Sequence, residues 1–294
     1  MSDGQEPDSA IRSAGKTVSN AFSDRQTFER SLDSIVANNR FTIAVVFPLV
    51  GAFTLLASAE GLLPEILTFN PYLVLFGVFV MRLPLISGLS PLVDRRAGIA
   101  LGLLFSYTYA IEFVGATTGV PYGEFHYEVS LGPMLLETIP WALPLFFVPL
   151  VLNSYLLCLL LLGSRASSPL VRIPVIAATI VAVDLVLDPA AVALGFWSFE
   201  AGGFYGVPVT NFAGWVLSAT VATILIDLAF SRGALLERVR TCSYILDDMV
   251  SFVLLWGAIN AFYGAWIPVA IAAGFAFSLI QLDRFDFDVV DQWR

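Results

Sequence analysis

The chain has 294 residues, of which 57% are hydrophobic and only 13% are charged. Soluble domains carry about 25% charged residues, so this composition excludes a soluble globular protein and indicates an integral membrane protein. The net charge of −9 argues against nucleic acid as a partner, and a single lysine (Lys16) and a single histidine (His126) exclude a membrane retinal Schiff base, bis-histidine haem and histidine-rich di-iron sites.

Residues 1–40 are polar and predict a cytoplasmic N-terminal tail that leads into a short surface helix. A membrane-spanning helix needs ~20 predominantly apolar residues. On that criterion residues 41–282 form a transmembrane catalytic domain, and residues 283–294 form an acidic cytoplasmic tail. The expected fold is an all-α, polytopic transmembrane bundle of about eight spans: 41–63, 71–90, 97–118, 134–162, 171–195, 212–232, 246–263 and 265–282. The last two are one apolar run divided at Tyr263-Gly264, so seven spans with a longer final helix is the alternative.

The basic residues predict the orientation of these spans. All of them except Arg82 fall in the N-terminal segment, in alternate loops or after the last span. Because positive charges stay in the cytoplasm, both termini are expected there, in a multi-pass protein of the cell membrane.

The loops on the opposite side combine aromatic residues with glycine and proline. They cover residues 121–127, 195–200 and 202–208. Aromatic belts occur at the edge of any bilayer, but this density of glycine and proline favours ordered structure over a cavity.

Several polar side chains lie within the expected spans, where each charged group costs about 2.5 to 3.5 kcal/mol. Glu112, Asp184 and Asp188 occupy the outer half of the membrane beneath the aromatic loops, and Asp184 and Asp188 share one helix face. They are the candidate catalytic residues; the alternative is that they only join helices. Arg82 is expected to be the counter-ion of one of the interior acids. The interior polar set is Glu60, Arg82, Glu112, Glu137, Asp184, Asp188, Asp227, Asn153, Asn211 and Asn260.

The spacing Asp184-Leu-Val-Leu-Asp188 invites comparison with membrane prenyltransferases, which bind magnesium diphosphate through two aspartate-rich motifs. A second such motif is lacking, and the aromatic loops contain no arginine or lysine for a diphosphate. Cys158 and Cys242 fit neither a disulfide framework nor a metal site.

Two blocks of the sequence resemble the signatures of the carotenoid-biosynthesis membrane hydratases. The first block is Glu112-Phe113-Val114-Gly115, Thr118-Gly119-Val120-Pro121-Tyr122-Gly123, Tyr127, Leu131-Gly132 and Pro140-Trp141. The second is Asp184, Asp188-Pro189, Trp197, Tyr205-Gly206-Val207-Pro208 and Asn211-Phe212-Ala213-Gly214-Trp215. The resemblance implies a cofactor-free enzyme that adds water to the terminal double bonds of an acyclic carotenoid. An acidic, lysine-poor composition favours a haloarchaeal member of the family.

Hydration of such an alkene by protonation passes through a tertiary carbocation. It requires an acid, stabilisation of the cation, and a water held by a base. We expect Asp184 or Asp188 to be the acid and Glu112 the base, with Asn211 holding the water. The candidate substrate-binding residues are Arg82, Tyr122, Tyr127, Trp141, Trp197, Tyr205, Asn211 and Trp215. The expected partners are the carotenoid, the lipid bilayer and other membrane enzymes of the carotenoid pathway, with no metal.

Two other functions remain open from the sequence. One is prenyl transfer to a carotenoid end, which needs magnesium and a diphosphate donor. The other is a transporter or carotenoid-binding protein, because midplane acids and proline-broken helices are expected there as well.

Overall fold

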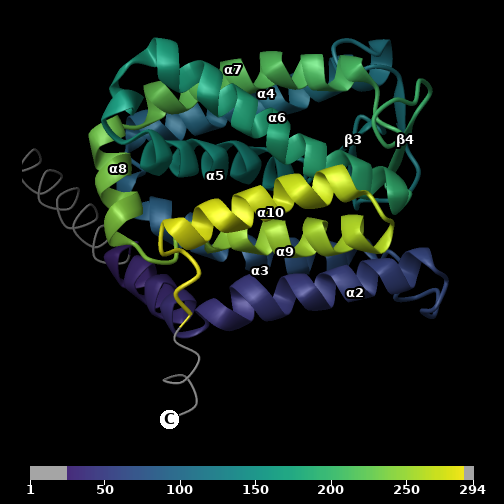
Figure 1. Cartoon of the computed structure of the whole chain (residues 1–294), viewed down its shortest axis with the longest axis horizontal. Coiled ribbons are helices and arrows are strands. Elements are labelled where there is room, and N and C mark those ends of the chain that lie inside the picture. The colour runs from purple at the N-terminus through teal and green to yellow at the C-terminus, as the bar shows by residue number, and fades with distance from the viewer. Residues whose placement is uncertain (1–24, 288–294) are drawn as a thin grey trace, which may run out of the picture.

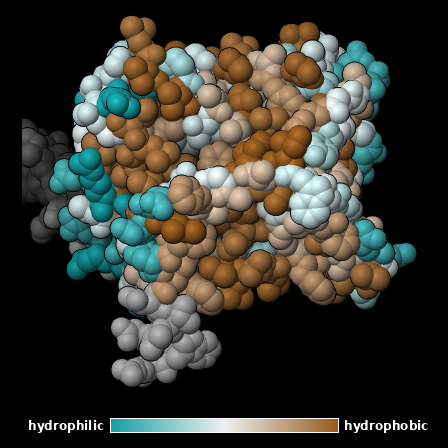
Figure 2. Space-filling view, in the orientation of Figure 1, coloured by the Kyte–Doolittle hydropathy of each residue, from teal (hydrophilic) through white to brown (hydrophobic). Residues whose placement is uncertain are grey.

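The computed structural model describes residues 25–287, which form the predicted all-α bundle (Figure 1). A π-helical turn (Thr42–Val46) continues into α2 (Phe47–Ala59). The other apolar helices are α3 (Pro71–Leu89), α4 (Arg95–Thr118), α5 (Pro144–Leu162), α6 (Pro169–Ala193), α7 (Val209–Ala229), α9 (Asp247–Phe262) and α10 (Trp266–Gln281). Within the described residues, six helices are long and apolar enough to cross a membrane. Apolar side chains cover the middle of the visible face, as a lipid-embedded protein requires (Figure 2).

The last apolar run is divided where the sequence predicts. Helix α9 ends at Phe262, and α10 begins at Trp266 and packs back against α9. Gly264 makes the reversal with a φ of +69°, a conformation that costs little only for glycine. The alternative of one longer final helix is therefore wrong.

The fourth expected span, 134–162, begins too early. Helix α5 starts at Pro144, and the preceding residues form a hairpin of β2 (Met134–Leu135) and β3 (Ile139–Pro140). Pro144 takes the first position of α5, where a missing N–H costs nothing, and Ile139–Pro140 pairs with Met134–Leu135 instead of continuing the helix. Glu137 consequently lies exposed at the hairpin turn, and its assignment to the membrane interior is wrong.

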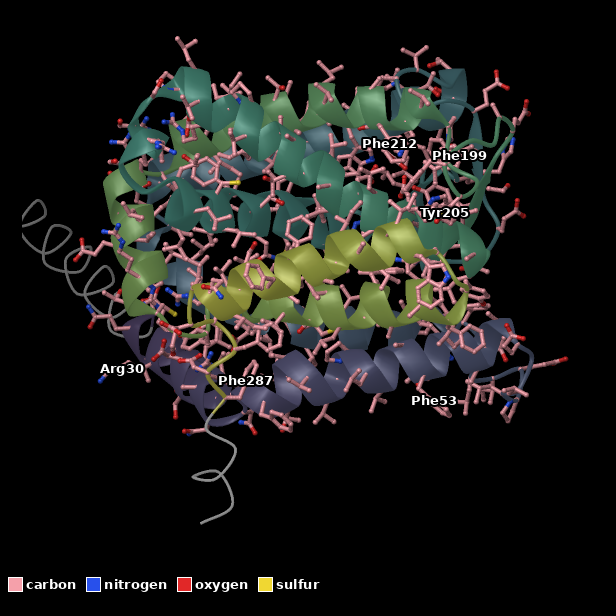
Figure 3. All side chains as sticks on the ribbon, in the orientation of Figure 1. Arg30, Phe53, Phe199, Tyr205, Phe212 and Phe287 are labelled. Carbon is pink, nitrogen blue, oxygen red and sulfur yellow. The ribbon has the colours of Figure 1, made fainter. Side chains whose placement is uncertain are left out.

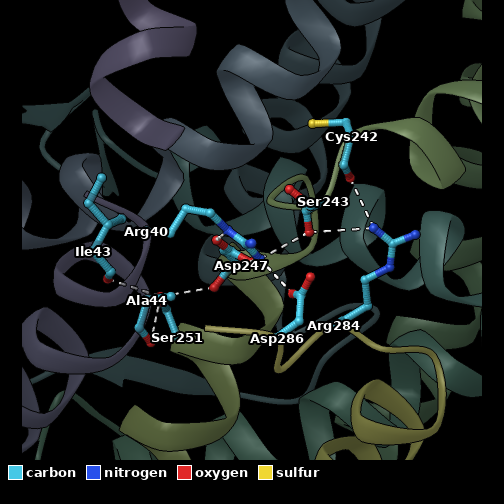
Figure 4. Close-up of polar contacts among 9 residues, drawn as sticks. All are labelled: Arg40, Ile43, Ala44, Cys242, Ser243, Asp247, Ser251, Arg284 and Asp286. Atoms are coloured by element: carbon cyan, nitrogen blue, oxygen red, sulfur yellow. Dashed lines mark hydrogen bonds and ion pairs between the residues drawn. The ribbon is translucent and has the colours of Figure 1, made fainter. Parts of the chain in front are cut away.

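The end of the bundle that the sequence predicts to be cytoplasmic carries the short helix α8 (Arg232–Thr241), on the left of Figure 1. Residues 25–38 are helical, as predicted, and the last described residues pack back onto the same end. Arg40 donates to both Asp247 and Asp286, and Arg284 donates to the carbonyl of Cys242 at 2.9 Å (Figure 4). The remaining parts of the two predicted tails, residues 1–24 and 288–294, lie outside the described residues.

The aromatic loops at the opposite end are ordered through a two-stranded sheet. Strand β1 (Phe125–Tyr127) pairs antiparallel with β4 (Trp197–Phe199), and His126 lies opposite Ser198. The pairing joins the loop after α4 to the loop after α6. It places a small aromatic sheet over the outer end of the bundle.

Candidate functional site

A cavity of about 120 Å³ lies beneath the β1–β4 sheet and extends between the helices. Its walls are mainly aromatic and aliphatic. Glu112, Asp188 and Asn211 supply polar groups, together with the hydroxyls of Tyr122 and Tyr127. The expectation of a cavity under ordered loops is thus confirmed.

Helix α4 presents Glu112 to the cavity one and a half turns before the helix ends at Thr118. Its carboxylate accepts a hydrogen bond from the hydroxyl of Tyr127 on β1. Burial and the neighbouring carboxyl raise the pKa of Tyr127 well above its ordinary value, so this hydroxyl stays protonated and donates. The strand pairing therefore fixes the orientation of the Glu112 carboxyl.

Helix α6 supplies the two aspartates on one face, and α7 supplies the amide that joins them. The Nδ2 group of Asn211 donates to Asp188 Oδ2 at 2.5 Å and to Asp184 Oδ2 at 3.1 Å. Asp188 lines the cavity, whereas Asp184 is fully buried behind it. The Oδ1 atom of Asp184 is buried and has no hydrogen-bond partner.

Tyr122 fills the gap between α4 and α7. A Cβ added at Gly115 of α4 would lie 2.9 Å from the Tyr122 ring, and one added at Gly214 of α7 would lie 2.6 Å from it. Only glycine admits the ring at both positions. The Tyr122 hydroxyl contacts Ser218 Oγ at 2.6 Å, and this oxygen also contacts the hydroxyl of Tyr107 at 3.0 Å.

Aromatic side chains form the apolar walls. The ring of Trp215 stacks on Phe147 with centroids 5.3 Å apart, and Trp197 meets Tyr127 edge to face at 6.4 Å. The lining also contains Phe146, Phe147, Phe199 and Trp256, which were not among the predicted residues. Phe146 and Phe147 lie in a uniformly apolar run of α5, and no pattern there distinguishes cavity-facing positions from buried ones.

Three of the candidate substrate-binding residues lie away from the cavity lining. Trp141 is 64% exposed and Tyr205 is 39% exposed; Tyr205 lies at the same outer end of the bundle as Phe199 (Figure 3). Arg82 is buried and forms an ion pair with Asp248 of α9. Its expected pairing with one of the interior acids of the candidate set is wrong.

Asp248 was missed because Asp247-Asp248 stands at the end of a span, where acids are usually solvated. Asp247 is buried and accepts from Arg40, while Asp248 turns inward and also accepts from Asn153 Nδ2 at 2.6 Å. Since Arg82 is held in this pair, no arginine or lysine lines the cavity formed by the described residues. The described part of the chain also has no cluster of three or more acidic, histidine or cysteine side chains able to hold a metal ion.

Comparison with known proteins identifies related sequences. A sequence model of the family described as "Carotenoid biosynthesis protein" matches residues 69–279, which include both motif blocks. A protein of Haloarcula japonica named bisanhydrobacterioruberin hydratase is 63% identical over 257 residues, covering 87% of this chain and 88% of the relative. No solved structure matches the chain.

Proposed function

The chain belongs to the carotenoid biosynthesis protein family and is a carotenoid hydratase, and we propose that Asp188 protonates its substrate while Glu112 activates the water. The cavity supports this proposal because its mainly apolar lining contains both Asp188, the proposed acid, and Glu112, the proposed base. By analogy with the Haloarcula japonica relative, the reaction converts bisanhydrobacterioruberin to bacterioruberin in the cell membrane.

Asp188 is the better candidate for the acid because it faces the cavity and Asp184 does not. Asp188 Oδ2 accepts a hydrogen bond from the Asn211 amide, so the transferable proton is assigned to the other carboxyl oxygen, Oδ1. Asp184 acts as a positioning residue. The Asn211 Nδ2 group donates to Asp184 and to Asp188, and these two hydrogen bonds fix the orientation of the Asn211 side chain.

The bond changes balance without a cofactor. The Asp188 proton forms a C–H bond with one alkene carbon, and the other carbon becomes a tertiary cation. A water oxygen then forms the C–O bond, while Glu112 takes a proton from that water. The faces of Trp197 and Trp215 stabilise the cation through their ring electrons, and no fixed positive charge in the lining opposes it.

One turnover leaves Asp188 without a proton and Glu112 with one. The starting state is restored when a proton returns from Glu112 to Asp188. Both groups line the same cavity, so the return takes place across the product's hydroxyl or a second water. The Tyr127 hydroxyl stays bonded to Glu112 and holds it toward the cavity throughout.

Prenyl transfer finds less support at this site. A diphosphate donor needs cationic side chains, and the cavity lining has none among the described residues.

The test is to incubate membranes that contain the protein with an anhydro carotenoid precursor and to follow the product by mass spectrometry. Gain of water, one molecule for each end hydrated, without added metal or diphosphate supports the proposal. Prenyl gain that requires magnesium, or an unchanged mass, refutes it.

A further inference from the structure

A second hollow lies at the cytoplasmic end of α4 and α7, far from the carotenoid cavity along both helices. It is a groove of about 580 Å³. Its walls are Ile99 and Leu103 of α4 and Leu225 and Leu228 of α7, and its floor is the methyl group of Ala100. Since Ile99, Leu103 and Leu228 are each more than half exposed, the groove opens toward the lipid.

Arg95 and Arg96 stand at the mouth of this groove, together with Asp94. The Asp94 carboxylate is engaged as the cap of α4, accepting from the N–H of Ala97 at 2.8 Å. Within residues 25–287, no hydrogen bond or ion pair joins either arginine side chain to the protein. Four other arginines at this end are bonded to the protein: Arg40 to Asp247, Arg172 to Asp227, Arg238 to the Gly88 carbonyl and Arg284 to the Val239 carbonyl.

We propose that this groove binds an anionic phospholipid, with the phosphate on Arg95 and Arg96 and one acyl chain along Ile99, Leu103 and Leu228. Adjacent guanidinium groups offer several donors to phosphate oxygens, and the positive end of α4 adds to the attraction. The apolar wall from Arg95 to Leu103 runs about 12 Å along the helix, which suits a chain that descends from the headgroup level.

The net negative charge of the chain restricts where an anionic lipid can bind. A net charge of −9 repels anionic lipids on average, so binding is expected only where unpaired basic groups gather beside an apolar channel. A zwitterionic lipid gains less from two arginines because its own cation cancels the phosphate charge.

The test uses the purified full-length protein in detergent, titrated with phosphatidylglycerol or phosphatidylcholine and observed by native mass spectrometry. We expect tighter binding of phosphatidylglycerol, and a loss of about tenfold or more in the R95Q/R96Q variant. The matched control is R165Q/R240Q, which removes two exposed arginines of the same end that also have no side-chain bond. Inorganic phosphate is added in a separate arm.

Equal binding of the two lipids, unchanged binding in R95Q/R96Q, or an equal loss in the control variant would overturn the proposal. Displacement of the lipid by millimolar inorganic phosphate would also overturn it, because a free anion would then be the ligand. Thermal unfolding in the same samples gives a second readout: phosphatidylglycerol should raise the Tm of the unmodified protein and not that of R95Q/R96Q.

Discussion

The two aspartates of α6 allow a direct test of which carboxyl supplies the proton. They share one helix face and one amide partner, but only Asp188 lines the cavity. We predict that Asp188→Asn lowers the rate of hydration by about 10²- to 10⁴-fold, the range that general acid catalysis contributes. The substitution keeps the volume and removes the proton.

Asp184→Asn is the matched comparison. It leaves Asp188 in place and weakens only the 3.1 Å bond that helps to orient Asn211. The net value of one hydrogen bond is about 1 kcal/mol, so we expect a loss of no more than about tenfold. The two variants therefore differ by at least about one order of magnitude.

The assay is carotenoid hydration in membranes adjusted to equal amounts of each variant, with the product measured by chromatography and mass spectrometry. Protein in the membrane fraction controls for folding. A larger loss in Asp184→Asn than in Asp188→Asn, or activity near that of the unmodified protein in Asp188→Asn, would refute the assignment of the acid.

Three further predictions follow from the geometry. Glu112→Gln should abolish measurable hydration because it removes the proposed base. Tyr127→Phe should lower the rate of hydration only about tenfold, because it removes the hydrogen bond that orients Glu112. Equal activity of the two variants would contradict the role of Glu112. Gly214→Ala should lower the stability of the protein in detergent by about 1–3 kcal/mol, since the added methyl group would lie 2.6 Å from the Tyr122 ring. Gly98→Ala is the control, because a methyl group there contacts nothing and should not lower the stability. Thermal unfolding measures both variants. Arg82→Met should destabilise by about 3–5 kcal/mol by leaving Asp248 unpaired, and adding Asp248→Leu should recover much of the loss in the same measurement.

The sequence predicts the helices well because hydropathy follows burial in lipid, and glycine and proline mark most of the breaks. It fails at residues 134–143, where the side chains are apolar enough for a span but the backbone pairs as the β2–β3 hairpin. Hydropathy records what a side chain prefers, and it does not record whether each backbone N–H finds a partner.

The polar part of the site was predictable because acids inside a bilayer are costly and therefore conspicuous. The pairing of Arg82 with Asp248 was not predictable, because the position of a residue along its own helix does not show which neighbouring helix its side chain contacts. The aromatic lining falls between these cases. Trp197 and Trp215 stand out by residue type, while Phe147 can be placed at the cavity only once α5 is packed.

The ring of Tyr122, held between Gly115 and Gly214, acts as a spacer between two helices. One of those helices carries Glu112, and the other carries the Asn211 that holds Asp188. The thickness of a single phenol ring thus sets the spacing between α4 and α7 beside the cavity, and with it how far Glu112 lies from the Asn211 amide. A larger residue at either glycine would push the helices apart, and a side chain smaller than tyrosine would let them approach, so the residues at positions 115, 122 and 214 together determine the width of the cavity on this side.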